Sequence, residues 1–353
     1  MTAISGEFPT SQLNRLPASP YYLEAVVTDL KKNGLLRTYY RDRLRGFRLG
    51  PRAKATLLDN WPERFTFYLT GDTDTNRLKS EVNRRLRLHR LAEAYTTMGN
   101  AGVAIYPDEK SPVFAPQGYC GKASSNPAFY SSREVKGLGI DATKIHNSRF
   151  AGVLLSPMKL FVTYSSGMSL MKWRYKSEMR VKAVMWNTLC QQRLPGQYRA
   201  DDIHGLILGD SMELAYQMLT STGGPKHDYF MLDGSYDHFH FLPNNHQGEV
   251  ILALLCDSVK TAELDRILSQ GLIANLGKAT EQDAAEPDGT PVLFAYSCDL
   301  PRIVRFNTSL ELTGRTGTLI CFDFQADTLR RFCGDRVRFQ TIDFEKFEGR
   351  FFP

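Results

Sequence analysis

The residues best suited to chemistry lie between positions 31 and 90, where sixteen Lys and Arg stand against six Asp and Glu. This segment has a net charge of +10, whereas the whole chain carries only +6. An arginine guanidinium is planar and can bind a phosphate, or the O6/N7 edge of guanine, through two parallel hydrogen bonds. The composition therefore points to nucleic acid as the ligand. The alternative is a solvated basic surface that serves only solubility.

Two histidines on one predicted strand form a second group. His238 and His240 are separated by one residue, so their side chains lie on the same face of a strand. Imidazole nitrogens bind divalent metal ions, and Tyr229, Tyr236 and His246 lie nearby in the sequence. Exposed or hydrogen-bonded histidines are the commoner outcome of such a pair, so the metal site is an alternative interpretation.

Three acidic residues form the third group. Glu178 lies in a predicted helix, Asp210 follows a buried apolar strand, and Asp233 follows the apolar run 229–232. Carboxylates at sheet ends can hold Mg²⁺ or Mn²⁺ through oxygen ligands, and such an ion can assist phosphodiester hydrolysis. In the alternative interpretation Glu178 forms an ion pair with Lys182, one helical turn later.

The elements that position the basic residues have the order helix, hairpin, helix. Ser19 and Pro20 are typical of a helix start, and Gly34 is typical of a helix end. Short apolar runs flank 41–46, whose Asp and Gly favour a turn, and Gly50 begins a further helix. With a short first helix at 10–16, this order predicts a winged helix-turn-helix. The 19–33 helix would enter the major groove and the hairpin would lie along the flanking backbone.

The predicted DNA-binding residues come from the recognition helix, the hairpin and a second basic helix at 77–95. They are Tyr22, Lys31, Lys32, Arg37, Arg41, Arg43, Arg45, Arg48, Arg52, Arg84, Arg85 and Arg87. The second basic helix either follows phosphates next to the hairpin or is an amphipathic connector whose polar face is merely basic.

The remainder of the chain alternates strands with helices. The runs 150–155 and 160–164 predict a hairpin, and 229–232 and 239–242 predict strands. The order strand, helix, strand over 318–342 has the length of a parallel crossover. We therefore expect an α+β chain, with a winged-helix region at 1–98 followed by an α/β domain with a mixed sheet at 99–353.

Several classes of protein are disfavoured. No stretch approaches the roughly 20 apolar residues of a membrane span, and the first thirty residues lack the order of a signal peptide. The six cysteines contain no CxxC pair, which argues against a zinc ribbon and a disulfide framework. Neither GxxxxGK[ST] nor a GxGxxG that opens a helix occurs, so nucleotide binding has no support. We expect a cytoplasmic protein.

The chain resembles the winged-helix replication-relaxation and mobilisation proteins carried by plasmids and integrative conjugative elements of Gram-positive bacteria. The resemblance rests on residues 30–36, 41–46 and 47–49 and covers about the first sixty residues. Farther on, the runs 129–136 and 320–324 look similar to uncharacterised proteins of the same elements. It implies DNA binding at an origin or promoter, sometimes with a fused nicking domain. For this interpretation we expect double-stranded DNA as the partner and no cofactor. We expect a DNA-binding protein of a bacterial mobile genetic element that acts in replication, mobilisation or regulation, and that can form a homo-oligomer.

The sequence leaves an enzyme as the alternative, in which the C-terminal domain is a metal-dependent DNA endonuclease or relaxase. The run His238-Phe239-His240 resembles the metal site of rolling-circle replication and relaxase enzymes. The acids Glu178, Asp210 and Asp233 are similar to those of nucleases of the restriction-endonuclease type. However, the acid-x-Lys triplet at 134–136 precedes the helix and Asp210, whereas that family places it after them. In a third interpretation the domain is a non-catalytic assembly or sensor module.

Overall fold

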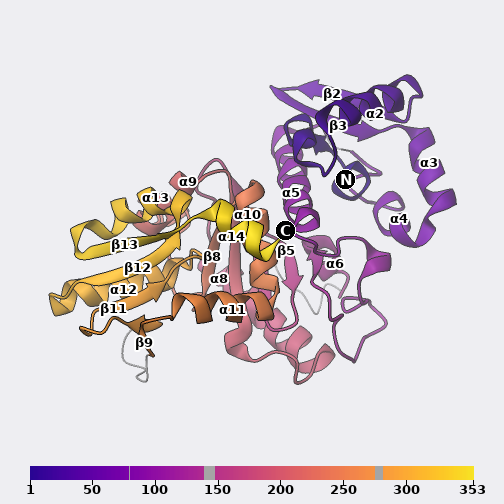
Figure 1. Ribbon diagram of the computed structural model, residues 1–353. Helices are drawn as coiled ribbons and strands as arrows, with labels where there is room; N and C mark the ends of the chain where they lie inside the picture. Colours follow the sequence, from indigo (N-terminus) through magenta and orange to yellow (C-terminus); the bar gives the residue numbers. More distant parts are fainter. Residues whose placement is uncertain (79, 139–147, 275–280) are drawn as a thin grey trace. The chain divides into compact units, whose positions relative to one another are not determined.

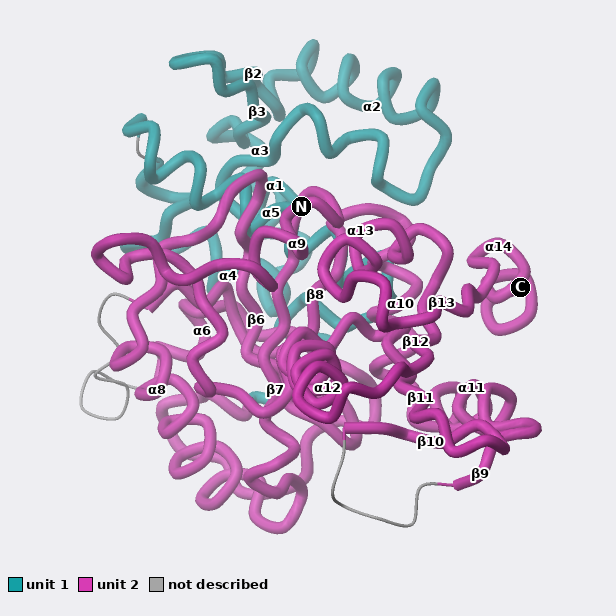
Figure 2. Tube along the Cα trace, turned by 90° about the vertical axis from the view of Figure 1, so that its left-hand side faces the viewer, with its two compact units in different colours: residues 1–112 teal, residues 113–353 magenta. Residues whose placement is uncertain are grey.

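The computed structural model describes residues 1–78, 80–138, 148–274 and 281–353. The chain divides into two compact units, Met1–Pro112 and Val113–Pro353, which Figure 2 draws in different colours. We describe each unit by itself.

Unit 1 combines short helices with a three-stranded antiparallel sheet of order β1-β3-β2. In chain order its elements are α1 (Thr2–Ser5), β1 (Phe8–Pro9), the 3₁₀ helix η1 (Thr10–Arg15), α2 (Pro20–Lys32), β2 (Leu36–Arg41), β3 (Leu44–Leu49), α3 (Pro51–Asn60), α4 (Pro62–Leu69), α5 (Val82–Asn100) and the 3₁₀ helix η2 (Pro107–Glu109). The boundary expected at 98/99 falls at the end of α5.

Local chemistry accounts for the start of α2 and for the hairpin. The Ser19 side chain accepts a hydrogen bond from the Tyr22 amide at 3.3 Å and so caps α2, as its position before Pro20 indicates. Arg41 pairs with Leu44, so the turn consists only of Asp42 and Arg43, whose φ angles are 52° and 60°. Positive φ at both positions is typical of a two-residue hairpin turn. The six-residue loop expected at 41–46 was therefore too long.

The core of unit 1 lies where α2 and α5 meet the hairpin. Phe8, Leu36, Phe47 and Ala92 are buried together, and the partly buried residues Met1, Leu13, Leu16, Val27, Leu30 and Leu49 pack against them. In Figure 1 the hairpin of β2 and β3 lies beside α2, in agreement with their contacts. The first helix expected at 10–16 is a 3₁₀ helix, and it adds Leu13 and Leu16 to this core.

Unit 2 is mixed α/β. Its elements are β4 (Ala128–Ser131), α6 (Ser132–Lys136), β5 (Phe150–Leu155), β6 (Leu160–Gly167), α8 (Tyr175–Val184), the π-helix η3 (Met185–Arg193), the 3₁₀ helix η4 (Ala200–Asp202), β7 (Ile203–Gly209), α9 (Met212–Thr220), β8 (Phe239–Pro243), α10 (His246–Cys256), α11 (Ser258–Leu268), β9 (Ile273–Ala274), β10 (Ala284–Ala285), β11 (Pro291–Phe294), α12 (Leu300–Thr313), β12 (Gly317–Phe322), α13 (Asp323–Cys333), the 3₁₀ helix η5 (Gly334–Arg336), β13 (Val337–Ile342) and α14 (Phe344–Phe351).

These strands form two mixed five-stranded sheets, of order β4-β5-β6-β7-β8 and β13-β12-β11-β10-β9. In the first sheet β4, β5 and β6 are antiparallel, whereas β6, β7 and β8 are parallel. In the second sheet β11, β12 and β13 are parallel. The segment after β11 connects the two sheets, because Asp299 forms an isolated bridge with His240 and the Cys298 carbonyl accepts from the Phe241 amide at 3.0 Å. We call this junction the sheet seam.

The mixed α/β class expected for the C-terminal region is confirmed, as are the hairpin of β5 and β6 and the parallel crossover through α13. The strand expected at 229–232 is wrong, because this segment forms only a bridge between Tyr229 and Lys172. All six cysteines are free thiols, and only Cys120 is exposed. Among the described residues, no helix has both the length and the apolar character needed to cross a bilayer.

Candidate functional site

The exposed positive charge of unit 1 is concentrated on the β2–β3 hairpin and on the helix ends beside it. Seven of the predicted DNA-binding cations are exposed there, together with Tyr22. They are Lys31, Lys32, Arg37, Arg41, Arg43, Arg45 and Arg52. Arg41 contacts Asp42 at 3.4 Å, and the Lys31 ammonium lies 4.9 Å from the centre of the Phe47 ring.

The other five cations have no carboxylate within 4 Å in the described part of the chain. They are Lys32, Arg37, Arg43, Arg45 and Arg52. We call these five residues the unpaired basic set. Cations without acidic partners keep their full charge available for an external anion.

Two of the predicted DNA-binding residues are not available for this purpose. Arg48 is only 4 % exposed and Arg85 is fully buried. Both guanidinium groups contact the buried carboxylate of Glu7, at 2.7 Å and 2.6 Å respectively. We therefore correct the expectation for Arg48 and Arg85, because a buried arginine paired with a carboxylate does not contact phosphates at the surface.

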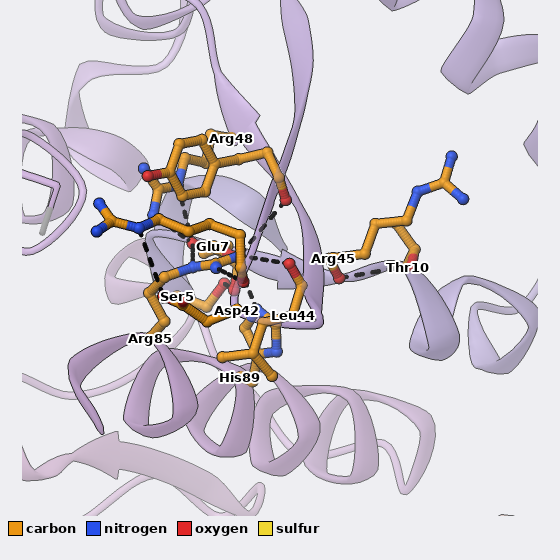
Figure 3. Close-up of polar contacts among 11 residues, drawn as sticks. Ser5, Glu7, Thr10, Asp42, Leu44, Arg45, Arg48, Arg85 and His89 are labelled. Atoms are coloured by element: carbon orange, nitrogen blue, oxygen red, sulfur yellow. Dashed lines mark hydrogen bonds and ion pairs between the residues drawn. The ribbon is translucent and has the colours of Figure 1, made fainter. Parts of the chain in front are cut away.

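Figure 3 shows how Glu7 gathers its partners from distant parts of unit 1. One carboxylate oxygen accepts from Arg48 on β3, and the other contacts Arg85 and the His89 Nε2 atom on α5, the latter at 2.8 Å. Burial alone would raise the pKa of Glu7, but hydrogen bonds from His89, Arg85 and Arg48 outweigh it and lower this pKa to about 2. Glu7 is therefore a buried anion that forms ion pairs with two buried cations.

The same network fixes the hairpin. Arg85 donates to the carbonyl oxygens of Arg41 at 2.7 Å and of Leu44 at 3.0 Å, which flank the two-residue turn. A Cβ atom on Gly46 would lie only 2.5 Å from a Glu7 oxygen, so this strand position needs glycine. Arg48 and Arg85 thus position the hairpin that presents Arg43 and Arg45.

The remaining cations predicted on α5 have acidic partners. Arg84 contacts Glu81 at 3.1 Å and Arg87 contacts Asp74 at 2.5 Å, all of them exposed side chains. Together with the burial of Arg85, this pairing favours the interpretation of α5 as a connector. It sets α5 apart from the unpaired basic set.

The three predicted catalytic acids of unit 2 occupy different environments. Glu178 is fully buried and accepts from the Ser148 hydroxyl at 2.7 Å and the Tyr164 hydroxyl at 3.0 Å. Burial raises the pKa of Glu178 even though these hydrogen bonds oppose the shift. Asp210 is exposed after β7. Asp233 accepts from the indole of Trp173 at 2.6 Å and from Ser235.

The expected ion pair between Glu178 and Lys182 is wrong. The Lys182 ammonium instead donates to the Ser235 carbonyl at 3.0 Å and lies 3.7 Å from Asp237. Across residues 1–78, 80–138, 148–274 and 281–353, no group of three or more His, Cys, Asp or Glu side chains is arranged to hold a metal ion.

His238 and His240 do share one face of the chain, with ring planes 9° apart. The structure adds two residues that the sequence did not single out, since His204 of β7 stacks on His238 at 4.5 Å and Asp299 accepts from His238 Nδ1 at 2.6 Å. Asp299 precedes a Leu-Pro pair that begins α12, a signal for a helix start but not for a histidine partner. Nothing in the sequence indicated His204.

A chain of hydrogen bonds determines where the protons of these rings lie. The Ser297 carbonyl only accepts, so we assign a proton to His240 Nδ1, 3.3 Å away. His240 Nε2 is then an acceptor for His204 Nδ1 at 3.0 Å. Burial lowers the pKa of His204 to about 2 and that of His240 to about 4. Both rings are therefore neutral at physiological pH, and they stabilise the sheet seam.

The comparisons add no relative. No family model, no curated protein and no solved structure matches this chain.

Proposed function

We propose that this chain is a DNA-binding protein of a bacterial mobile genetic element, acting in the cytoplasm in replication, mobilisation or regulation. Unit 1 binds duplex DNA as a winged helix. The observation that carries this proposal is the unpaired basic set, which lies on the hairpin and the adjoining helix ends, whereas Arg84 and Arg87 of α5 have acidic partners and Arg85 is buried. No cofactor is needed for this activity.

The order of elements supports a winged helix. A short helix, a strand, a second short helix, the longer α2 and a hairpin follow one another, and β1 pairs with β3 of the hairpin. Unit 1 departs from the motif in its first two helices, since α1 has four residues and η1 is a 3₁₀ helix. Helix α5 packs against β1 and β3 and supports the sheet in their place.

The number of unpaired cations predicts how steeply the affinity for DNA falls with salt concentration. Each phosphate contact releases condensed counterion with a log–log slope of about −0.9, so five contacts give a slope of about −4.5. Fluorescence anisotropy of a labelled duplex, titrated with the full chain between 50 and 200 mM NaCl (roughly the range in which this effect is large), measures the slope. Replacing Arg43 and Arg45 by Gln should make it less steep by about 2.

The matched control replaces Arg84 and Arg87 by Gln, which removes the same charge from α5. Because these arginines already have acidic partners, the slope should change by less than about 1. Equal effects of the two double variants, or binding that does not respond to salt, would contradict the proposal.

The same samples test the alternative of a metal-dependent nicking enzyme. Supercoiled DNA is incubated with the protein and Mg²⁺ or Mn²⁺, and relaxed circles are scored on a gel. Nicks that disappear in Glu178→Gln or His238→Ala would assign catalysis to unit 2. Binding without nicks leaves the regulator or initiator as the function.

A further inference from the structure

A second site lies in unit 2, between the loop that precedes β8 and the first turns of α12. It is a pocket of about 190 Å³, smaller than the roughly 300 to 1,000 Å³ of pockets for drug-sized ligands. Rings and apolar side chains make up most of its wall, and two carboxylates of the loop, Asp233 and Asp237, also line it. Its principal lining residues are Trp173, Phe230, Asp233, Tyr236, Phe239 and Val304.

The carboxylate of Asp233 is held in a fixed orientation. One oxygen accepts from the Trp173 indole at 2.6 Å, and the other accepts from the amide of Ser235 at 2.9 Å and from its hydroxyl. All of these donors are neutral. Among the described residues, Asp233 has no Lys, Arg or His within ion-pair distance, so its charge has no counter-charge of its own.

Two cations beside the pocket already have partners. Arg305 lines the pocket but contacts Glu281 at 2.6 Å and donates to the Asp237 carbonyl at 3.2 Å. Lys182 donates to the Ser235 carbonyl at 3.0 Å and lies 5.5 Å from the centre of the Tyr236 ring. The half-buried carboxylate of Asp233 therefore faces a mostly apolar wall with its charge uncompensated.

We propose that this pocket binds a small organic cation, an alkylammonium ion whose charged nitrogen faces Asp233 and whose carbon atoms contact the rings. Aromatic side chains attract cations through the negative faces of their π systems, and proteins use this attraction to recognise quaternary ammonium ligands. The carboxylate adds the opposite charge. An anion would be repelled by the Asp233 carboxylate, and a neutral ligand would leave the charge of Asp233 without a counter-charge. Both would therefore fit the site less well than a cation.

The test compares choline with 3,3-dimethylbutan-1-ol, a neutral molecule of the same shape. Both carry nine equivalent methyl protons, so saturation-transfer-difference NMR on the full chain follows them equally well, at constant ionic strength. We expect choline to bind with a Kd on the order of 1 mM, and the neutral analogue to bind at least about tenfold more weakly. Equal binding of the two, or no binding of choline, overturns the proposal.

Two variants locate the site. Asp233→Asn keeps the shape of the side chain and should weaken choline binding at least about tenfold. Asp237→Asn is the control, because Asp237 also lines the pocket but is 72 % exposed and paired with Lys182. Similar effects of the two variants overturn the proposal. Val304→Phe fills the pocket from α12 and should abolish choline binding. If a variant does not fold, the comparison of choline with its neutral analogue on the unaltered chain still tests the proposal.

Discussion

Replacing Glu7 by glutamine should destabilise unit 1 by about 3 kcal/mol. The substitution keeps the shape of the side chain but leaves Arg48 and Arg85 buried without a counter-charge, and breaking a buried pair in this way costs about 3 to 5 kcal/mol. The lowered pKa of Glu7 gives a free energy of the same size. A shift from 4.5 to about 2 corresponds to about 3 kcal/mol for a side chain that is 0 % exposed and little screened by solvent.

The pH dependence has a definite sign. The pKa of Glu7 is lower in the folded protein than in the unfolded chain, so its stabilising contribution is complete above about pH 4.5 and is lost as the pH falls toward 2. Between pH 5 and about pH 2, unit 1 of the Glu7→Gln variant should therefore lose less stability than unit 1 of the unaltered chain.

The chain has two units, so one global unfolding curve does not isolate this effect. Hydrogen exchange followed by mass spectrometry, at increasing urea, gives the free energy of opening for peptides of β2, β3 and α5. Peptides of β6 and β7 in unit 2 serve as an internal reference.

The matched control is Glu81→Gln. Glu81 also pairs with an arginine, Arg84, but both side chains are exposed, so this change should cost no more than about 1 kcal/mol. An effect of Glu7→Gln no larger than that of Glu81→Gln would refute the reasoning about the buried network.

Three further predictions concern single groups. Gly46→Ala should destabilise the hairpin by about 1 to 3 kcal/mol, because the added Cβ atom would collide with Glu7. The same hydrogen-exchange experiment measures this loss, and an unchanged free energy of opening for β2 peptides would contradict the prediction. Glu178→Ala should lower the stability of unit 2 by about 2 to 4 kcal/mol, because Ser148 and Tyr164 lose a buried acceptor, whereas Glu178→Gln should lower it less. Urea unfolding midpoints of unit 2, followed by tryptophan fluorescence in a Trp61→Phe background, compare the two variants. Because the pKa values of His204 and His240 are lower in the folded protein than in the unfolded chain, the unfolded chain takes up protons at a higher pH than the folded protein does. Unit 2 should thus lose stability below about pH 6.5, by up to about 1.4 kcal/mol per pH unit for each ring. His204→Phe should reduce that slope, and an unchanged slope speaks against the buried neutral pair.

Features set by neighbouring residues could be predicted from the sequence. The cap at Ser19 and the hairpin of β5 and β6 depend on residues within a few positions of one another, and the structure has both. The spacing of Ser131 and Glu134 is likewise typical of a capping box, and the Glu134 carboxylate accepts from the Ser131 amide at 2.8 Å. In these cases the local pattern and the final fold agree.

Features set by distant residues could not be predicted. Arg48 and Arg85 share the sequence pattern of surface arginines, and only the approach of Glu7, 41 and 78 positions away, reveals that they are buried. Likewise His238 finds Asp299 across 61 positions. The sequence does not show which charged residues pair with one another, so the predicted DNA-binding residues included two arginines that are buried.

The Glu7 network also bears on how unit 1 forms as the chain leaves the ribosome. The hairpin and its unpaired basic set are complete by residue 52, yet Arg85, which holds the hairpin turn, and His89 both contact Glu7 from the later helix α5. Contacts of such long sequence separation form late, because the intervening chain must first be ordered. A nascent chain that ends before α5 therefore carries the basic residues without a fixed hairpin. If unit 1 binds DNA as we propose, its affinity for nucleic acid arises only as α5 docks, after Arg85 and His89 have been synthesised.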